Sequence, residues 1–137
     1  MAVGTEGRVH LVWPTLVSGS TAGSEPALAL FYSMSDDGRT FSARQRLATE
    51  GTPGHAQIAI NAADGSLLVV WDELKDGTRQ AVAARGIPDA TGGVQFVREQ
   101  TAPGGSAYPV VVSTASGFLV GWTDTSRSPS SIALQHK

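Results

Sequence analysis

The heptapeptide Gly65-Ser66-Leu67-Leu68-Val69-Val70-Trp71 decides the fold, because the chain contains two more copies of this phrase. The other copies are Gly7-Arg8-Val9-His10-Leu11-Val12-Trp13 and Ser116-Gly117-Phe118-Leu119-Val120-Gly121-Trp122, and the three copies hold all the tryptophans. They recur roughly every 50 to 60 residues, a period typical of stacked or radial units that cannot bury an apolar face alone. The repeat therefore predicts three successive structural units.

Each copy is predicted to be the second of four short antiparallel strands. The tryptophan strand is largely apolar, as expected for a strand covered on both faces, and the fourth strand is polar and alternating, as expected for an exposed edge. Asp76-Gly77 is typical of a tight turn, and no window shows the spacing of an amphipathic helix. The first strands are expected at 55–61 and 107–113, the third at 28–33, 80–85 and 131–136, and the fourth at 43–47 and 94–99.

Repeated four-stranded antiparallel units of this length are typical of β-propeller blades. We expect an all-β fold of about three blades, at residues 1–49, 50–101 and 102–137. A β-sandwich is the alternative, but it gives no reason for the repeated phrase. Most of the first strand of the first blade and the fourth strand of the last are missing, and three blades are too few for a ring of about 4 to 8. We therefore expect either an internal fragment of a longer propeller or a chain that self-associates.

Composition excludes several classes of protein. The 137 residues carry a net charge of −2, which argues against a nucleic-acid surface, and no apolar run is long enough to span a membrane as a helix. Cysteine is absent, so neither a disulfide framework nor thiol chemistry is available. Residues 1–4 lack the features of a signal peptide. No cofactor and no metal site is expected.

One motif resembles a known family. Between the third and fourth strands of the first unit lies Met34-Ser35-Asp36-Asp37-Gly38-Arg39-Thr40-Phe41. It resembles the Asp box of sialidases and related proteins, with Asp36, Gly38, Thr40 and Phe41 matching in one alignment and Ser35 and Asp37 in a version one residue shorter. An aspartate side chain here is expected to accept backbone N–H bonds, with Gly38 at an unusual φ and Phe41 buried as an anchor.

The resemblance implies a sialidase-like propeller and an extracellular or periplasmic location. It also implies that the Asp box is structural and lies on the opposite face from the binding site. The binding face would hold the loops from second to third strand and those leading into each first strand. A catalytic sialidase would bring three arginines together, with a Tyr–Glu pair and an acidic Asp. By this map no three arginines of the chain converge, so catalytic residues remain unassigned.

Several residues are candidates for ligand binding on that face. Asp72 and Glu73 follow the second tryptophan, and such carboxylates serve acid–base work or bind sugar hydroxyls, although solvated turn carboxylates are the simpler interpretation. His55 is a candidate base or ligand, with an ordinary polar contact as the alternative. The other candidates are Gln57, Tyr108 and Asp124. The tryptophans are expected to pack between blades.

Three functions remain open from the sequence. The first is a non-catalytic propeller segment that binds glycan or protein through this loop face. The second is a fragment of an exo-sialidase or related glycoside hydrolase whose catalytic arginines lie in other blades. The third is a half-propeller that oligomerises as a structural module.

Overall fold

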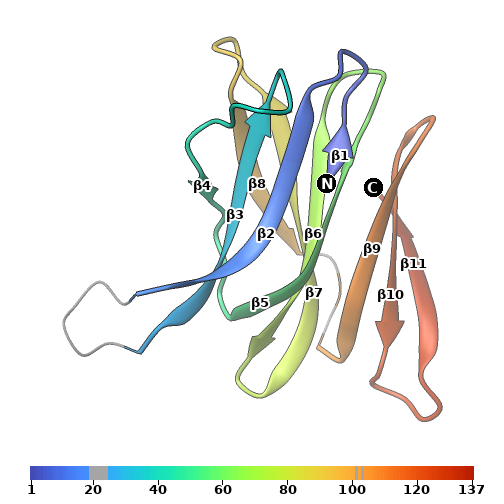
Figure 1. Ribbon diagram of the computed structural model, residues 1–137. Helices are drawn as coiled ribbons and strands as arrows, with labels where there is room; N and C mark the ends of the chain where they lie inside the picture. The colour runs from blue at the N-terminus through green and yellow to red at the C-terminus, as the bar shows by residue number, and fades with distance from the viewer. Residues whose placement is uncertain (19–24, 101, 103) are drawn as a thin grey trace.

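The computed structural model describes residues 1–18, 25–100, 102 and 104–137. Within these residues the chain is all-β and contains no helix, so none that could cross a membrane. Eleven strands form three antiparallel sheets (Figure 1), each with its strands in chain order. Sheet 1 holds β1 (Ala2–Val3), β2 (Val9–Val17), β3 (Ala27–Ser35) and β4 (Gln45–Arg46). Sheet 2 holds β5 (Thr52–Ile60), β6 (Leu67–Lys75), β7 (Thr78–Pro88) and β8 (Val94–Gln100), and sheet 3 holds β9 (Ser106–Thr114), β10 (Gly117–Asp124) and β11 (Ser131–His136).

The strands expected from the sequence are present, although the one expected at 43–47 is reduced to the two residues of β4, and each tryptophan phrase forms the second strand of its sheet. Trp13 pairs with Phe31, Trp71 with Val82 and Trp122 with Ala133 of the third strand, so the three indoles occupy equivalent positions. The expected turn at Asp76-Gly77 joins β6 to β7, and both of its residues have positive φ (50° and 75°). In sheet 1 the first-strand position holds the two-residue β1, which pairs with β2.

Sheet 2 lies between the other two sheets, and β6 is its most buried strand. Alternate side chains of a strand point to opposite faces, and both faces of β6 are covered. Leu67, Val69 and Trp71 pack on the side of sheet 1, with Leu30 and Tyr32. On the other side Leu68 and Val70 pack with Phe118 and Val120 of sheet 3. This double burial explains the continuous apolar run of β6.

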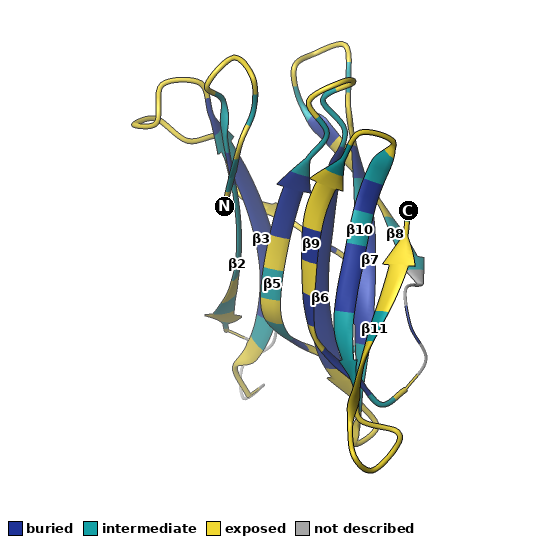
Figure 2. Cartoon of the chain, turned by 90° about the vertical axis from the view of Figure 1, so that its right-hand side faces the viewer, coloured by how far each residue is buried: buried dark blue, intermediate teal, exposed yellow. Residues whose placement is uncertain are grey.

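Neighbouring sheets meet along their first strands. Inner strand β5 contacts β1 on one side and β9 on the other. Figure 2 shows β5 and β9 running side by side, with the third sheet's last strand, β11, exposed at one side of the molecule. The turns β6–β7 and β10–β11 lie at the same end of the sheets as the starts of β5 and β9, the lower end in Figure 1. This end gathers the candidate binding residues.

The turn after β3, with the motif at 34–41, lies at the opposite end (Figure 1). Asp37 Oδ1 accepts the N–H bonds of Arg39 and Thr40, at 2.8 and 2.7 Å, and a 2.9 Å bond from the Ser35 hydroxyl. These bonds, the one from Thr40 N–H first, lower the pKa of Asp37 to about 2. The prediction that an aspartate accepts backbone N–H bonds here is confirmed.

Three further details of this turn concern Asp36, Gly38 and Phe41. The neighbouring carboxylate, Asp36, instead pairs with Arg8, its Oδ1 lying 2.5 Å from Nε. Gly38 has the expected positive φ, 68°. The prediction that Phe41 is buried is wrong, because 39% of it is exposed. It lies in a surface connection in which every residue from 36 to 46 is exposed, so no second layer covers its ring.

Candidate functional site

The carboxylate of Asp72 lies near the end of β6 and is completely buried. It receives an ion pair from Arg79 of β7, with 2.6 Å between Nη1 and Oδ1. The backbone N–H of Tyr108 in β9 donates to Oδ2 at 2.8 Å, and Nδ1 of His55 in β5 lies 3.0 Å from the same oxygen. A buried charge is tolerated only when it is paired and hydrogen-bonded in this way. Asp72 therefore links three strands of two sheets.

His55 is oriented by this contact. A carboxylate can only accept, so the His55 Nδ1–H donates to Asp72 and the Nε2 atom lies on the far side of the ring. About half of the His55 side chain is exposed (49%), as is more than half of Tyr108. Their rings meet edge to face, with centroids 4.5 Å apart. Asp72 thus anchors an exposed pair of rings from below.

The backbone at His55 and Tyr108 has the same irregular form. The register shifts between Gly54 and Gln57 on β5, and again opposite Gly121 and Thr123 on β9. Each shift leaves two residues unpaired, His55 with Ala56 and Tyr108 with Pro109. The first of each pair, His55 and Tyr108, has a positive φ, 48° and 54°. Such φ values are uncommon for residues with a side chain and tend to occur at functional positions. β-Bulges re-aim side chains at sheet ends, and here two equivalent bulges bring two rings together.

Glu73 lies on the other face of β6 and is also completely buried. Its oxygens accept bonds from Arg98 of β8, Gln80 Nε2 (3.0 Å) and Trp71 Nε1 (3.2 Å). The backbone N–H of Glu50 adds a fourth, at 3.2 Å. Burial by itself raises the pKa of Glu73, but the bonds from Arg98, Gln80 and Trp71 outweigh it and hold the pKa at about 2. Glu73 is therefore an ionised residue within the packing of sheets 1 and 2.

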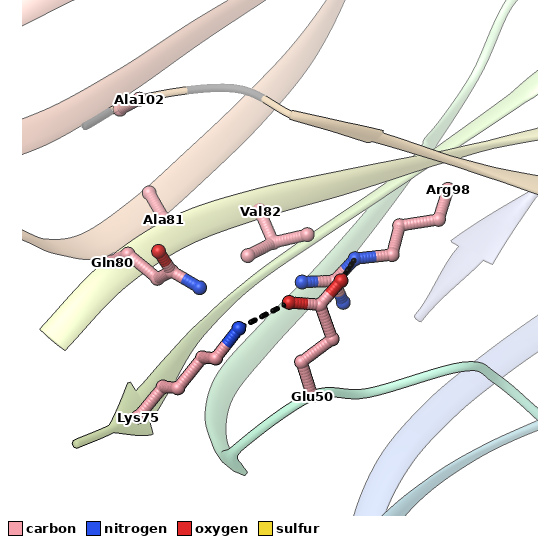
Figure 3. A pocket seen from close by; sticks show the side chains of 7 residues that line it. All are labelled: Glu50, Lys75, Gln80, Ala81, Val82, Arg98 and Ala102. Atoms are coloured by element: carbon pink, nitrogen blue, oxygen red, sulfur yellow. Dashed lines mark hydrogen bonds and ion pairs between the residues drawn. The ribbon is translucent and has the colours of Figure 1, made fainter. Parts of the chain in front are cut away.

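A polar cavity of about 210 Å³ lies beside this cluster (Figure 3). Glu50 is joined to Lys75 at 2.8 Å and to Arg98 at 3.5 Å across its mouth. Arg98 also lies 5.5 Å from the centre of the Trp71 ring, a cation–π contact. The rest of the lining is Gln80, Ala81, Val82 and Ala102. Because its charged groups already pair with one another, this cavity offers fewer free partners than the surface above Asp72.

The structure brings together three of the candidate residues, Asp72, His55 and Tyr108. It separates Glu73 from them on the opposite face of β6. The simpler interpretation of Asp72 and Glu73 as solvated turn carboxylates is wrong, because neither has any exposed surface. The reason is that β6 continues to Lys75 between two covering sheets, so that both residues still lie within the sheet.

The remaining two candidates do not join this cluster. Gln57 is exposed on β5, two residues beyond His55. Asp124 accepts bonds from the N–H and hydroxyl of Ser126 in its own turn, at 2.9 and 2.5 Å, and these bonds, the hydroxyl first, lower its pKa. Asp124 thus has a local turn role in the structure.

Arg98 was missed by the sequence reasoning. Its only sequence signal is its place on the alternating strand β8, where it shares a face with Trp71 and Glu73. Arg79 follows the Asp76-Gly77 turn in the sequence, and its ion pair with Asp72 comes from the structure. Among the described residues, no group of three histidine, cysteine or acidic side chains is placed to hold a metal ion.

No protein-family model matches this sequence, and no curated protein matches it either. The geometry of the site therefore carries the functional argument.

Proposed function

We propose that the chain is a segment of a sialidase-like β-propeller that binds a carbohydrate through the surface formed by His55, Arg79 and Tyr108. The architecture is supported by three sheets of consecutive strands that pack face to face in chain order, with their first strands side by side. Propeller blades have this strand order and this relation to their neighbours. The Asp37 turn, at the other end of the sheets, agrees with the resemblance to an Asp box.

The observation that carries the binding proposal is the buried carboxylate of Asp72 beneath exposed groups. It orients Arg79 by an ion pair, and His55 and the main chain of Tyr108 by hydrogen bonds. Side chains held in this way lose little conformational freedom when a ligand binds. The two rings offer apolar edges and faces to a sugar ring, while His55 Nε2 and the other guanidinium N–H groups of Arg79 face its hydroxyl or carboxylate oxygens. Such a surface suits a small polar ligand.

The same geometry argues against glycoside cleavage by these residues. Most glycosidases use two carboxyl groups that flank one bond, roughly 5 to 9 Å apart, and sialidases use a tyrosine nucleophile together with a carboxylic acid. Asp72 and Glu73 lie on opposite faces of β6, are buried, and are occupied by Arg79 and Arg98. We therefore propose binding without turnover, and we expect no hydrolysis of a fluorogenic sialoside by this chain.

The test is a titration of the isotope-labelled chain with sialyllactose and with lactose, followed by amide chemical shifts. We expect saturable shifts at 54–56, 79, 107 and 108, and their loss in Tyr108→Ala. Gln57→Ala is the control, because Gln57 is exposed on β5, the strand of His55, but lies outside the Asp72 network. The proposal would be refuted if neither glycan produced shifts at these residues. It would also be refuted if Tyr108→Ala bound the glycan as tightly as wild type.

A further inference from the structure

Every sheet of this chain has two different faces. The Trp face carries the tryptophan of the second strand, and the back face is the opposite one. The Trp face of sheet 2 packs on the back face of sheet 1 through Trp71, Leu30 and Tyr32. The Trp face of sheet 3 packs on the back face of sheet 2 in the same way, with Phe118 against Leu68. The two interfaces inside the chain are thus equivalent: in each, a Trp face covers the back face of the preceding sheet.

The back face of sheet 3 has the same apolar character but is exposed. Val110 and Val112 of β9 are 49% and 55% exposed, and Ile132 and Leu134 of β11 are more exposed still. Gly121 of β10 lies between Val110 and Leu134, whose methyl groups come within contact distance of it. The equivalent face of sheet 2, with Leu68 and Val70, is fully buried by sheet 3. A cluster of exposed branched side chains on one sheet face is typical of an interaction surface.

The Trp face of sheet 1 also has the features of an inter-sheet contact. Trp13 lies beside Phe31, with ring centroids 6.2 Å apart, and the Arg44 guanidinium lies 4.7 Å from the Phe31 ring centre. Trp13 is only half-buried, whereas Trp71 at the same position of sheet 2 is fully buried. Sheet 1 therefore presents the same kind of face that sheets 2 and 3 use for packing, and this face is only partly covered.

Arg44 supports this equivalence. It stands two residues before Arg46, the partner of Phe31, as Arg98 stands two residues before Gln100, the partner of Val82. Arg98 stacks on the Trp face of sheet 2 and donates to the Ala48 carbonyl at 3.1 Å, in the connection that leads from β4 of sheet 1 to β5. An arginine at this position thus joins the Trp face of its own sheet to the chain that leaves the sheet before it. Arg44 is in place to do the same for a sheet packed on Trp13.

We propose that the back face of sheet 3 binds the Trp face of sheet 1 of a second copy of this chain. The occupant follows from the interfaces inside the chain, since a Trp face is what covers each buried back face. The contact joins different patches of two copies and is therefore heterologous, and such contacts make a ring when the rotation closes. Two copies hold six sheets, within the roughly 4 to 8 blades of propellers. Ring closure rests on the proposed propeller architecture, whereas the pairing of the two faces does not.

The experiment measures mass by light scattering for the full chain and for variants that block one face each. Wild type is expected at twice the 14.2 kDa chain mass. Val112→Glu blocks the back face of sheet 3 and Trp13→Ala the Trp face of sheet 1, so each variant alone is expected at half the wild-type mass. Val97→Glu is the matched control, because Val97 is similarly exposed (59%) but belongs to sheet 2, and it is expected to stay dimeric.

Mixing the two blocked variants separates a heterologous contact from a symmetric one. Each variant retains the face that the other has lost, so an equimolar mixture is expected to form a one-to-one complex. A monomeric wild type would overturn the proposal, and so would dimers of Trp13→Ala alone or a mixture that stays monomeric where wild type is dimeric. Circular dichroism checks folding, and Leu134→Glu and Leu11→Glu replace either variant that fails to fold. None of these residues touches the Asp72 network, so sialyllactose binding tests the site separately.

Discussion

Asp72 and Glu73 are neighbours in sequence and equally buried, yet they do different things. Asp72 faces sheet 3 and holds groups that are themselves exposed, namely His55, Arg79 and the main chain at Tyr108. Glu73 faces sheet 1 and holds groups within the packing, namely Arg98, Gln80 and the Trp71 indole. The difference comes from the alternation of a strand, which sends adjacent side chains to opposite faces.

The comparison shows that burial of a charge does not by itself mark a functional site. What distinguishes the two carboxylates is the exposure of the groups that they orient. Arg98 is 21% exposed and is shared by Glu73, the Trp71 ring and the Ala48 carbonyl, which makes it a link between sheet 2 and the connection that follows β4. His55 is about half exposed and leads outward to Tyr108. The following predictions test whether this division of roles holds.

The largest effect is expected from Glu73→Ala. This substitution leaves the largely buried Arg98 with the Ala48 carbonyl and with the more distant Glu50, at 3.5 Å, as its carboxylate partner, and it leaves the Trp71 N–H without the Glu73 acceptor. Removing one partner of a buried ion pair costs about 3–5 kcal/mol, which urea denaturation would measure as a lower free energy of unfolding. Lys75→Ala removes an exposed ion pair to Glu50 and is the control, with little or no change expected in the free energy of unfolding. Equal losses in the two variants would contradict the role assigned to Glu73.

A smaller effect is expected from Asp72→Asn. The amide keeps the shape and an oxygen that accepts the Tyr108 N–H, and Arg79 is exposed enough for water to solvate it. Weakening a buried polar network in this way costs about 1–3 kcal/mol. Sialyllactose binding should fall by a larger factor than stability alone explains, because His55 and Arg79 lose the anion that orients them. Unchanged binding would show that Asp72 is structural, like Glu73.

Acid should weaken the fold through Glu73. Its pKa in the folded chain, about 2, lies below the ordinary 4.5, so its contribution to stability is complete above pH 4.5 and is lost as pH falls toward 2. Ordinary acidic buffers reach only the upper part of the range between pH 4.5 and 2. We therefore expect acid to lower the free energy of unfolding by less than Asp72→Asn does. Melting temperatures of wild type and Glu73→Gln should converge on acidification. Parallel curves would contradict the prediction, and Asp37→Asn separates out the turn carboxylate, whose pKa is also about 2.

The strands could be predicted from the sequence because each has a local pattern. Strand β6 is apolar throughout since two sheets cover it, and β8 alternates since one of its faces is exposed. The cluster at Asp72 could be predicted only as a set of residues at one end of the sheets. Its geometry depends on the two bulges at His55 and Tyr108, and a bulge shifts register without a sequence signal as strong as Asn-Gly in a turn.

Two further errors have physical causes of the same kind. Phe41 was expected to be buried because an aromatic side chain usually anchors a turn, but the connection that holds it runs over the surface. The burial of Glu73 depends on Arg98, which is distant in sequence and comes from another strand. Contacts of this kind depend on the packing of sheets and not on any local pattern.

The smallest effect on stability is expected from Tyr108→Gly, and it sharpens the comparison most directly. Tyr108 holds Asp72 through its backbone N–H, while its ring projects to the surface and contacts His55. Glycine adopts the φ of 54° found here without steric cost, which offsets the greater freedom of the unfolded chain, so the free energy of unfolding should change by about 1 kcal/mol or less. Glycan binding should be lost, because the exposed ring is gone while the carboxylate below keeps its hydrogen bond. His55→Gly is the counterpart, since it relieves the same kind of φ but also removes a side-chain partner of Asp72, and it should be the less stable of the two. If Tyr108→Gly unfolded at much lower urea than His55→Gly, the Tyr108 ring would belong to the packing of sheets 2 and 3 and the exposed pair of rings would not be the binding surface.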